Sequence, residues 1–163
     1  MQVLVTYYSR TGTTRNLAEQ VMRGVQQVRG VECLIKPCDE VSKEDFLDSD
    51  AIVAGSPVYF GSMAAELKSV FDGFNGIRRR MEGKIGAAFA TSHHGSGGKE
   101  TTLISILQAM LIFGMVVVGD PMDAGGHYGV AHAKGEEKDF RDDAAKLGKR
   151  VAELVVRLSP TSG

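Results

Sequence analysis

Short apolar runs alternate with segments of helical periodicity along the whole chain, and this alternation is the feature that most restricts the fold. The apolar runs cover residues 2–7, 31–35, 51–55, 85–91 and 115–118. Runs of this length, bounded by turn-forming residues, are typical of buried strands. Five strands that alternate with helices predict a parallel sheet with right-handed crossovers and helices on both faces, a doubly wound α/β fold.

The segments between these runs carry apolar residues every three or four positions, which predicts helices. We expect helices within residues 17–28, 63–74, 103–111 and 140–158. A loop of about twenty residues separates the last strand from the C-terminal helix. A loop this long in a compact domain is usually functional.

Composition narrows the classes of function. The 163 residues are 43% hydrophobic, which is enough for one domain over residues 1–163 with its own core. A net charge of -1 gives no electrostatic reason to expect nucleic acid or an anionic membrane as a partner. The start of the chain does not resemble a secretory signal, and the apolar stretch 103–118 is short for a membrane span. We therefore expect a cytoplasmic protein without membrane insertion.

The two cysteines, Cys33 and Cys38, have no cluster of His or Cys around them. Neither a zinc site nor a disulfide is predicted, and we expect no metal.

The turn after the first strand has the features of an anion-binding site. Four hydroxyl side chains and one arginine surround a glycine where the strand leads into a helix: Ser9, Arg10, Thr11, Gly12, Thr13 and Thr14. Backbone N–H groups at the start of a helix point toward such a site. The first carboxylate after it is Glu19, although helix starts usually carry an acidic residue. The turn leaves its negative charge to a ligand, and a phosphate would fit.

Three other readings of these segments are weaker. Hydroxyl side chains often do nothing more than cap a helix, but four of them exceed what capping requires. Residues 95–101 resemble a Walker A motif only faintly, because His93 stands where its first glycine should be and Glu100 where Ser or Thr should follow the lysine. A phosphatase of this topology would need a cysteine within the first turn, and that turn has none.

Residues 9–14, Ser-Arg-Thr-Gly-Thr-Thr, match the flavodoxin phosphate-loop pattern Ser/Thr-x-Thr-Gly-x-Thr at its usual place. Residues 55–63, 91–98 and 126–129 resemble the flavin loops of the WrbA-type NAD(P)H:quinone oxidoreductases. The resemblance covers nearly the whole chain. It implies a flavodoxin-like fold with strand order 2-1-3-4-5 and bound flavin mononucleotide (FMN).

The resemblance also implies roles for the later loops. One side of the flavin ring would be framed by Pro57, Val58, Tyr59, Phe60 and Gly61. Backbone N–H groups and hydroxyls of a second loop would face the pyrimidine edge of the ring, with contacts from Thr91, Ser92, His93, Gly95 and Gly97. His127 and Tyr128 would be catalytic residues that contact the substrate, either from the long loop of their own chain or from a neighbouring subunit.

Charge near the ring separates two functions. Residues 9–15, 56–63 and 91–98 contain no Asp or Glu, and the last of these segments carries two histidines. Such surroundings favour an enzyme that accepts a hydride. The resemblance implies that the hydride comes from NADH or NADPH and passes to a quinone. An electron-transfer flavodoxin without a substrate of its own stays open, as does an FMN-binding regulatory module. The segment 36–50 lacks an insertion typical of the WrbA family, so the resemblance leaves a homodimer and a homotetramer both open.

Overall fold

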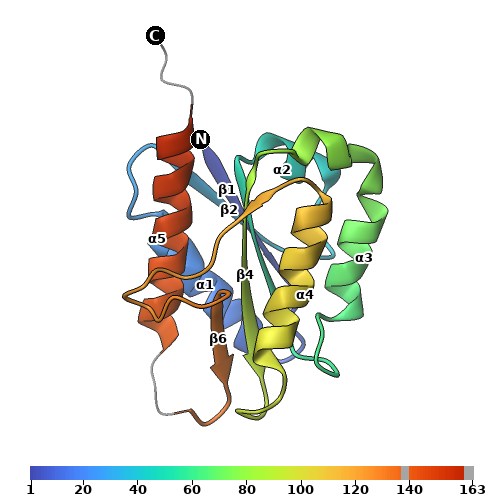
Figure 1. Ribbon diagram of the computed structural model, residues 1–163, viewed down its shortest axis with the longest axis vertical. Coiled ribbons are helices and arrows are strands. Elements are labelled where there is room, and N and C mark those ends of the chain that lie inside the picture. Colours follow the sequence, from blue (N-terminus) through green and yellow to red (C-terminus); the bar gives the residue numbers. More distant parts are fainter. Residues whose placement is uncertain (137–139, 160–163) are drawn as a thin grey trace.

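The computed structural model describes residues 1–136 and 140–159, and a parallel sheet forms its centre (Figure 1). The strands are β1 (Gln2–Tyr7), β2 (Glu32–Pro37), β3 (Ala51–Pro57), β4 (Ile85–Ser92), β5 (Val116–Val117) and β6 (Val130–Ala133). Their order is β2-β1-β3-β4-β5, so the predicted topology is confirmed. The strands of the centre are nearly all apolar because helices cover both of their faces.

The sixth strand lies where the sequence predicted only a loop, and that part of the prediction is wrong. β5 pairs with the start of β4, at Ile85 and Gly86, whereas β6 pairs with its end, from Phe89 to Ser92. Both lie along the same edge of β4, so one strand position is interrupted by residues 118–129. β6 has the sequence Val-Ala-His-Ala, which lacks the run of branched and aromatic residues typical of a strand.

Helices cover the sheet in two layers. α1 (Thr13–Val25) and α5 (Phe140–Leu158) lie on one face, and α3 (Ala65–Gly73) and α4 (Lys99–Ile112) lie on the other (Figure 1). The second layer also holds the short helix α2 (Lys43–Asp48) and the 3-10 helix η1 (Asn75–Met81). Each layer buries its apolar side chains against the sheet, which gives two separate hydrophobic clusters.

The sequence analysis missed α2, although its start carries a recognisable signal. Ser42 accepts a hydrogen bond from the Asp45 N–H, and the Asp45 carboxylate accepts one from the Ser42 N–H. This reciprocal capping box stabilises the first turn of a helix of only six residues.

The end of α2 is stabilised by a lysine from a distant segment. Lys84 donates to the carbonyl oxygens of Leu47 and Ser49, both at 2.6 Å, and more weakly to that of Phe46 at 3.4 Å. These carbonyls have no later helical turn to donate to them. Burial lowers the pKa of the Lys84 ammonium, which shows that its surroundings are partly dry.

Replacing Lys84 with methionine is expected to lower the free energy of unfolding by about 2 kcal/mol, because buried carbonyls lose a charged donor. The matched control is Lys68→Met, which breaks an exposed pair with Asp72 four residues away. That change should cost about 0.3 kcal/mol. Urea unfolding of both variants measures the two effects, and equal losses would contradict this role for Lys84.

The two cysteines are not reactive groups. Burial raises the pKa of the Cys33 and Cys38 thiols to about 11, so neither is a reactive thiolate at neutral pH.

The exposed side chains Arg78, Arg79 and Arg80 lie in η1, just before β4 begins and therefore at the opposite end of the sheet from the loops that follow the strands. Among the described residues, no helix is long and apolar enough to cross a membrane.

Candidate functional site

Three loops meet beyond the carboxyl ends of β1, β3 and β4, at the lower end of the sheet in Figure 1. They are residues 8–12, 58–64 and 93–98. The Val58 N–H donates to the Thr91 carbonyl at 2.7 Å, which ties the second loop to the end of β4. The first loop is tied to the same strand, because the hydroxyls of Thr14 and Thr91 lie 2.8 Å apart. The structure therefore brings together the three segments that the sequence selected.

The first loop ends where α1 begins, and a glycine stands just before the helix. Gly12, the residue before α1, has a φ of 90°, which only glycine adopts readily. Gly12 has no side chain that could cap α1, and the first turn of the helix holds no acidic residue. Ser9 Oγ accepts from the Arg15 N–H at 3.2 Å, and the Thr11 and Thr13 hydroxyls lie 3.5 Å apart. With open space around Gly12 as well, this turn can receive an anion.

Thr14 differs from the other hydroxyl residues of the turn. Its side chain is 2% exposed and pairs with Thr91, whereas Thr11 and Thr13 are exposed. The Thr14 hydroxyl therefore connects α1 to β4.

The second loop presents an aromatic side chain on a tight turn. Tyr59 and Ser62 exchange two backbone hydrogen bonds, of 3.0 and 3.1 Å, around Phe60 and Gly61. Both central residues have positive φ, 51° and 77°. This conformation is uncommon for phenylalanine, and the ring is fully exposed. A Cβ at Gly98 would lie 2.9 Å from the Gly61 Cα, so the second and third loops are in close backbone contact.

The third loop is held by its own hydrogen bonds. The His94 carbonyl accepts from the Ser92 hydroxyl at 2.8 Å and from the Gly97 N–H at 3.0 Å. The His94 ring lies 2.9 Å from the Ser96 hydroxyl, and the His93 side chain is exposed. A Cβ at Gly97 would lie 2.9 Å from the His94 carbonyl oxygen, so this turn leaves little room for a larger residue.

A carboxylate that the sequence analysis did not consider lies beside this loop. Glu136 follows β6, and its Oε1 lies 3.7 Å from where a Cβ at Gly95 would be. It pairs with Lys99 at the start of α4 and accepts from the Ala133 N–H at 2.9 Å. Burial raises the pKa of this carboxyl, but the bonds from Lys99 and Ala133 outweigh burial and lower it. No signal in the sequence indicates this pair, because it depends on the unpredicted strand β6.

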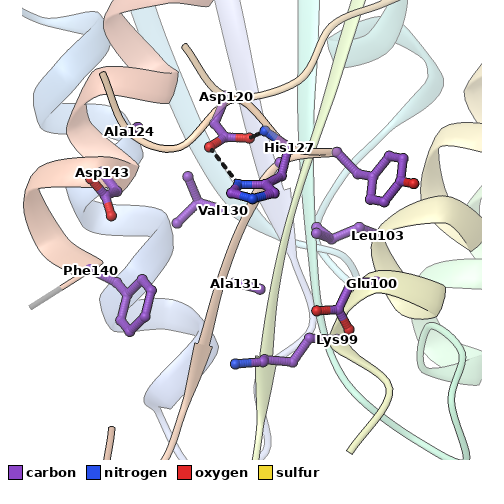
Figure 2. A pocket seen from close by; sticks show the side chains of 12 residues that line it. Lys99, Glu100, Leu103, Asp120, Ala124, His127, Val130, Ala131, Phe140 and Asp143 are labelled. Carbon is purple, nitrogen blue, oxygen red and sulfur yellow. Dashed lines mark hydrogen bonds and ion pairs between the residues drawn. The ribbon is translucent and has the colours of Figure 1, made fainter. Parts of the chain in front are cut away.

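The structure does not bring His127 and Tyr128 to the three loops of their own chain. They end the segment between β5 and β6, and Tyr128 lies five residues before Ala133, about 16 Å along an extended strand. His127 lines a separate cavity of about 190 Å³ between α4 and α5 (Figure 2). There Asp120 accepts from the His127 N–H at 2.7 Å, and its carboxylate lies 3.8 Å from the ring Nδ1. A contact through a neighbouring subunit stays a prediction.

The hydrogen-bond donors and the aromatic turn of the three loops fit the phosphate and the ring of FMN. The start of α1, which holds no acidic residue, and the hydroxyls of Ser9, Thr11 and Thr13 suit a phosphate. The aromatic turn 59–62 suits a flat ring, and the glycine-rich loop 93–98 lets backbone N–H groups approach a polar ring edge.

Comparisons with known proteins agree with this arrangement. Residues 1–128 match the model of the family described as NADPH-dependent FMN reductase. A protein named NAD(P)H dehydrogenase (quinone) from Archaeoglobus fulgidus is 34% identical, over 96% of this chain and 98% of its own. A protein named flavodoxin from Aquifex aeolicus is 36% identical, over 94% of this chain and 86% of its own.

A solved structure gives the same fold. The flavodoxin, WrbA-like protein from Agrobacterium tumefaciens superposes with a TM-score of 0.82 over 96% of this chain and 98% of that chain, at 21% identity. At that identity the likeness shows the fold alone. The family match and the relatives above show that the chain belongs to the NADPH-dependent FMN reductase family, and its fold is flavodoxin-like.

Proposed function

We propose that the protein binds FMN in the three loops and catalyses hydride transfer from NADH or NADPH to quinones. The coarser assignment, an FMN-dependent oxidoreductase, follows from its family and relatives. In the overall reaction the nicotinamide gives a hydride, solvent gives a proton, and the quinone becomes a quinol. Bound FMN would supply the ability to take a hydride from one substrate and give it to the next.

The observation that carries this proposal is the charge of the site. The loops 8–12, 58–64 and 93–98 contain no carboxylate of their own. Glu136, beside Gly95, is neutralised by Lys99. Glu66 lies within hydrogen-bond reach of the Tyr8 side chain at the start of the first loop. Negative charge that develops at the ring edge beside the third loop would meet backbone N–H groups and histidines. Such surroundings favour hydride acceptance over a cofactor held at low potential.

Each part of the site has a proposed role. Ser9, Thr11 and Thr13 donate hydroxyls to the phosphate, beside the backbone N–H groups that follow Gly12. Arg10 is exposed on the same turn and adds positive charge. Thr14 positions this turn against β4 through its bond to Thr91.

The ring would lie between the second and third loops. Pro57, Val58 and Tyr59 fix the second loop, and the turn at Phe60 and Gly61 borders the ring. The third loop would present its polar groups to the other edge, from Thr91, Ser92, His93, Gly95 and Gly97. The bond from Val58 to Thr91 and the contact of Gly61 with Gly98 hold these two walls at a fixed separation.

A second candidate is an electron-transfer flavodoxin, which the name of the Aquifex aeolicus relative supports. Such a carrier would exchange electrons with protein partners and would not react with a nicotinamide.

Anaerobic mixing of the FMN-loaded protein with NADH or NADPH separates the two functions. We expect the yellow absorbance of oxidised flavin to be lost on mixing, and to return when benzoquinone is added. The control is the same mixture with the Thr13→Asp variant, which should bind FMN about a thousandfold more weakly. If dithionite bleaches the flavin but neither nucleotide does, the enzyme assignment is wrong and the carrier is favoured.

A further inference from the structure

A groove of about 790 Å³ opens beside the second loop, between α3 and α4. It is separate from the cavity that His127 lines. Its apolar lining comes from the turn and from both helices: Tyr59, Phe60, Met63, Ala65, Ala109 and Ile112. A groove of this size is large enough for part of a small organic ligand.

Most of the surface that lines the groove is apolar, although Ser62, Glu66, Lys68 and Gln108 also line it. The Ser105 hydroxyl is already used, because it donates to the Thr102 carbonyl at 2.7 Å and accepts from the Met63 N–H at 3.1 Å. Phe60 is fully exposed and Ile112 is 64% exposed, at the two ends of the groove. An apolar ligand would remove both side chains from water.

The groove is continuous with the proposed flavin site. Tyr59 and Phe60 belong to the turn that borders the ring, and they also form the first part of the groove. From there it follows α4 from Ser105 to Ile112, a rise of about 10 Å along the helix. A substituent attached to a quinone that lies against the ring would therefore enter the groove directly.

We infer that this groove binds the apolar tail of the quinone, so that the substrate class is alkyl- or prenyl-substituted quinones rather than small quinones without a tail. This inference rests on the proposed function. It makes Ala109 and Ile112 residues that determine specificity, because they contact the tail and not the reacting ring.

The charged residues at the edge of the groove favour a ligand tail, rather than a second copy of this chain, as the molecule that occupies it. Glu66 and Lys68 border the groove, and both are exposed. The cores of homodimer interfaces are depleted in lysine and glutamate. A narrow tail can enter between such side chains, whereas a flat protein surface would have to bury them.

The test compares two quinones that share one ring, 2,3-dimethoxy-5-methyl-1,4-benzoquinone without a tail and with a decyl tail. The FMN-loaded protein is assayed with NADH or NADPH, below the solubility limit of each quinone. We expect kcat/KM to be at least about tenfold higher with the tail, since one fully buried methylene contributes about a factor of four. The variant Ala109→Phe fills the groove and should abolish this preference while it leaves kcat/KM for the tail-less quinone unchanged.

A matched control is Ser69→Phe, which adds the same ring on α3 at an exposed position outside the groove. This variant should keep the preference. If wild type reduces both quinones equally well, or if Ala109→Phe keeps the preference, the groove inference is wrong and the proposed function stands. If neither quinone is reduced, the proposed function itself fails. Sedimentation of Ala109→Phe adds one outcome: a change in oligomeric state with the preference intact would assign the groove to a subunit interface and overturn the inference.

Discussion

Replacing Thr13 with aspartate is expected to weaken FMN binding about a thousandfold and, at the same time, to stabilise the protein without its cofactor. Thr13 is the first residue of α1, and that helix has no acidic residue in its first turn. A carboxylate there interacts well with the helix dipole and should add about 0.5 kcal/mol to the free energy of unfolding. The same charge repels a phosphate by about 4 kcal/mol, roughly a thousandfold in affinity. Calorimetric titration with FMN and urea unfolding measure the two effects.

The control for this change is Thr13→Asn, which keeps a polar side chain without the charge. We expect it to weaken FMN binding by no more than about a hundredfold, short of the aspartate variant, because at most one hydrogen bond to the charged phosphate is lost. The opposite signs of the two effects of aspartate exclude general damage to the fold as their cause. An aspartate variant that binds FMN as tightly as wild type would mean that the phosphate does not lie at this turn.

Replacing Gly148 with alanine should have the largest effect on stability. Gly148 lies in α5, where a Cβ would come 2.0 Å from the Val21 carbonyl oxygen of α1. On the other side, a Cβ at Gly24 of α1 would come 1.8 Å from the Ala145 carbonyl oxygen. The two backbones are in direct contact at both glycines, so one methyl group has to push the helices apart. We expect a loss of about 3 kcal/mol in the free energy of unfolding, the upper end for overpacking, because backbone atoms cannot rotate away.

Gly73→Ala is the matched control for this methyl group. Gly73 ends α3, and a Cβ there would meet no atom within 4 Å. Alanine should therefore be neutral or stabilise the protein by about 0.5 kcal/mol. Urea unfolding of both variants tests this comparison. The midpoint should fall for Gly148→Ala and not for Gly73→Ala, while the dependence of the unfolding free energy on urea concentration stays the same. If Gly148→Ala were as stable as wild type, the close packing of α1 on α5 would be wrong.

The fold was predictable because the spacing of apolar residues along the chain reflects which side chains are buried. The runs at residues 2–7, 51–55 and 85–91 are largely apolar on both faces, and that pattern is typical of a sheet covered on both sides. β6 could not be predicted, because its strand character comes from pairing with β4 and not from its own residues. The capping box at Ser42 and Asp45 could have been recognised, and with it α2.

The site was predictable where function leaves an unusual local sequence. Four hydroxyls and no carboxylate at the start of α1 cannot be explained by helix stability alone, so they indicated the first loop. Thr14 pairs with Thr91, and Lys99 pairs with Glu136. Each pair joins segments that are distant in the sequence, so a pattern of residues within one segment could not predict it. His127 was selected by resemblance, but the interruption between β5 and β6 keeps it away from the loops of its own chain.

The central claim is that the turn at residues 9–14 receives the phosphate of FMN. The most direct measurement compares the affinity of the cofactor-free protein for FMN and for riboflavin, which has the same ring and no phosphate, by quenching of flavin fluorescence. Hydrogen bonds to a charged group contribute about 1.5–3 kcal/mol each, so two of them predict that FMN binds at least about a hundredfold more tightly. Equal affinities for the two flavins, or no binding of either, would contradict the account.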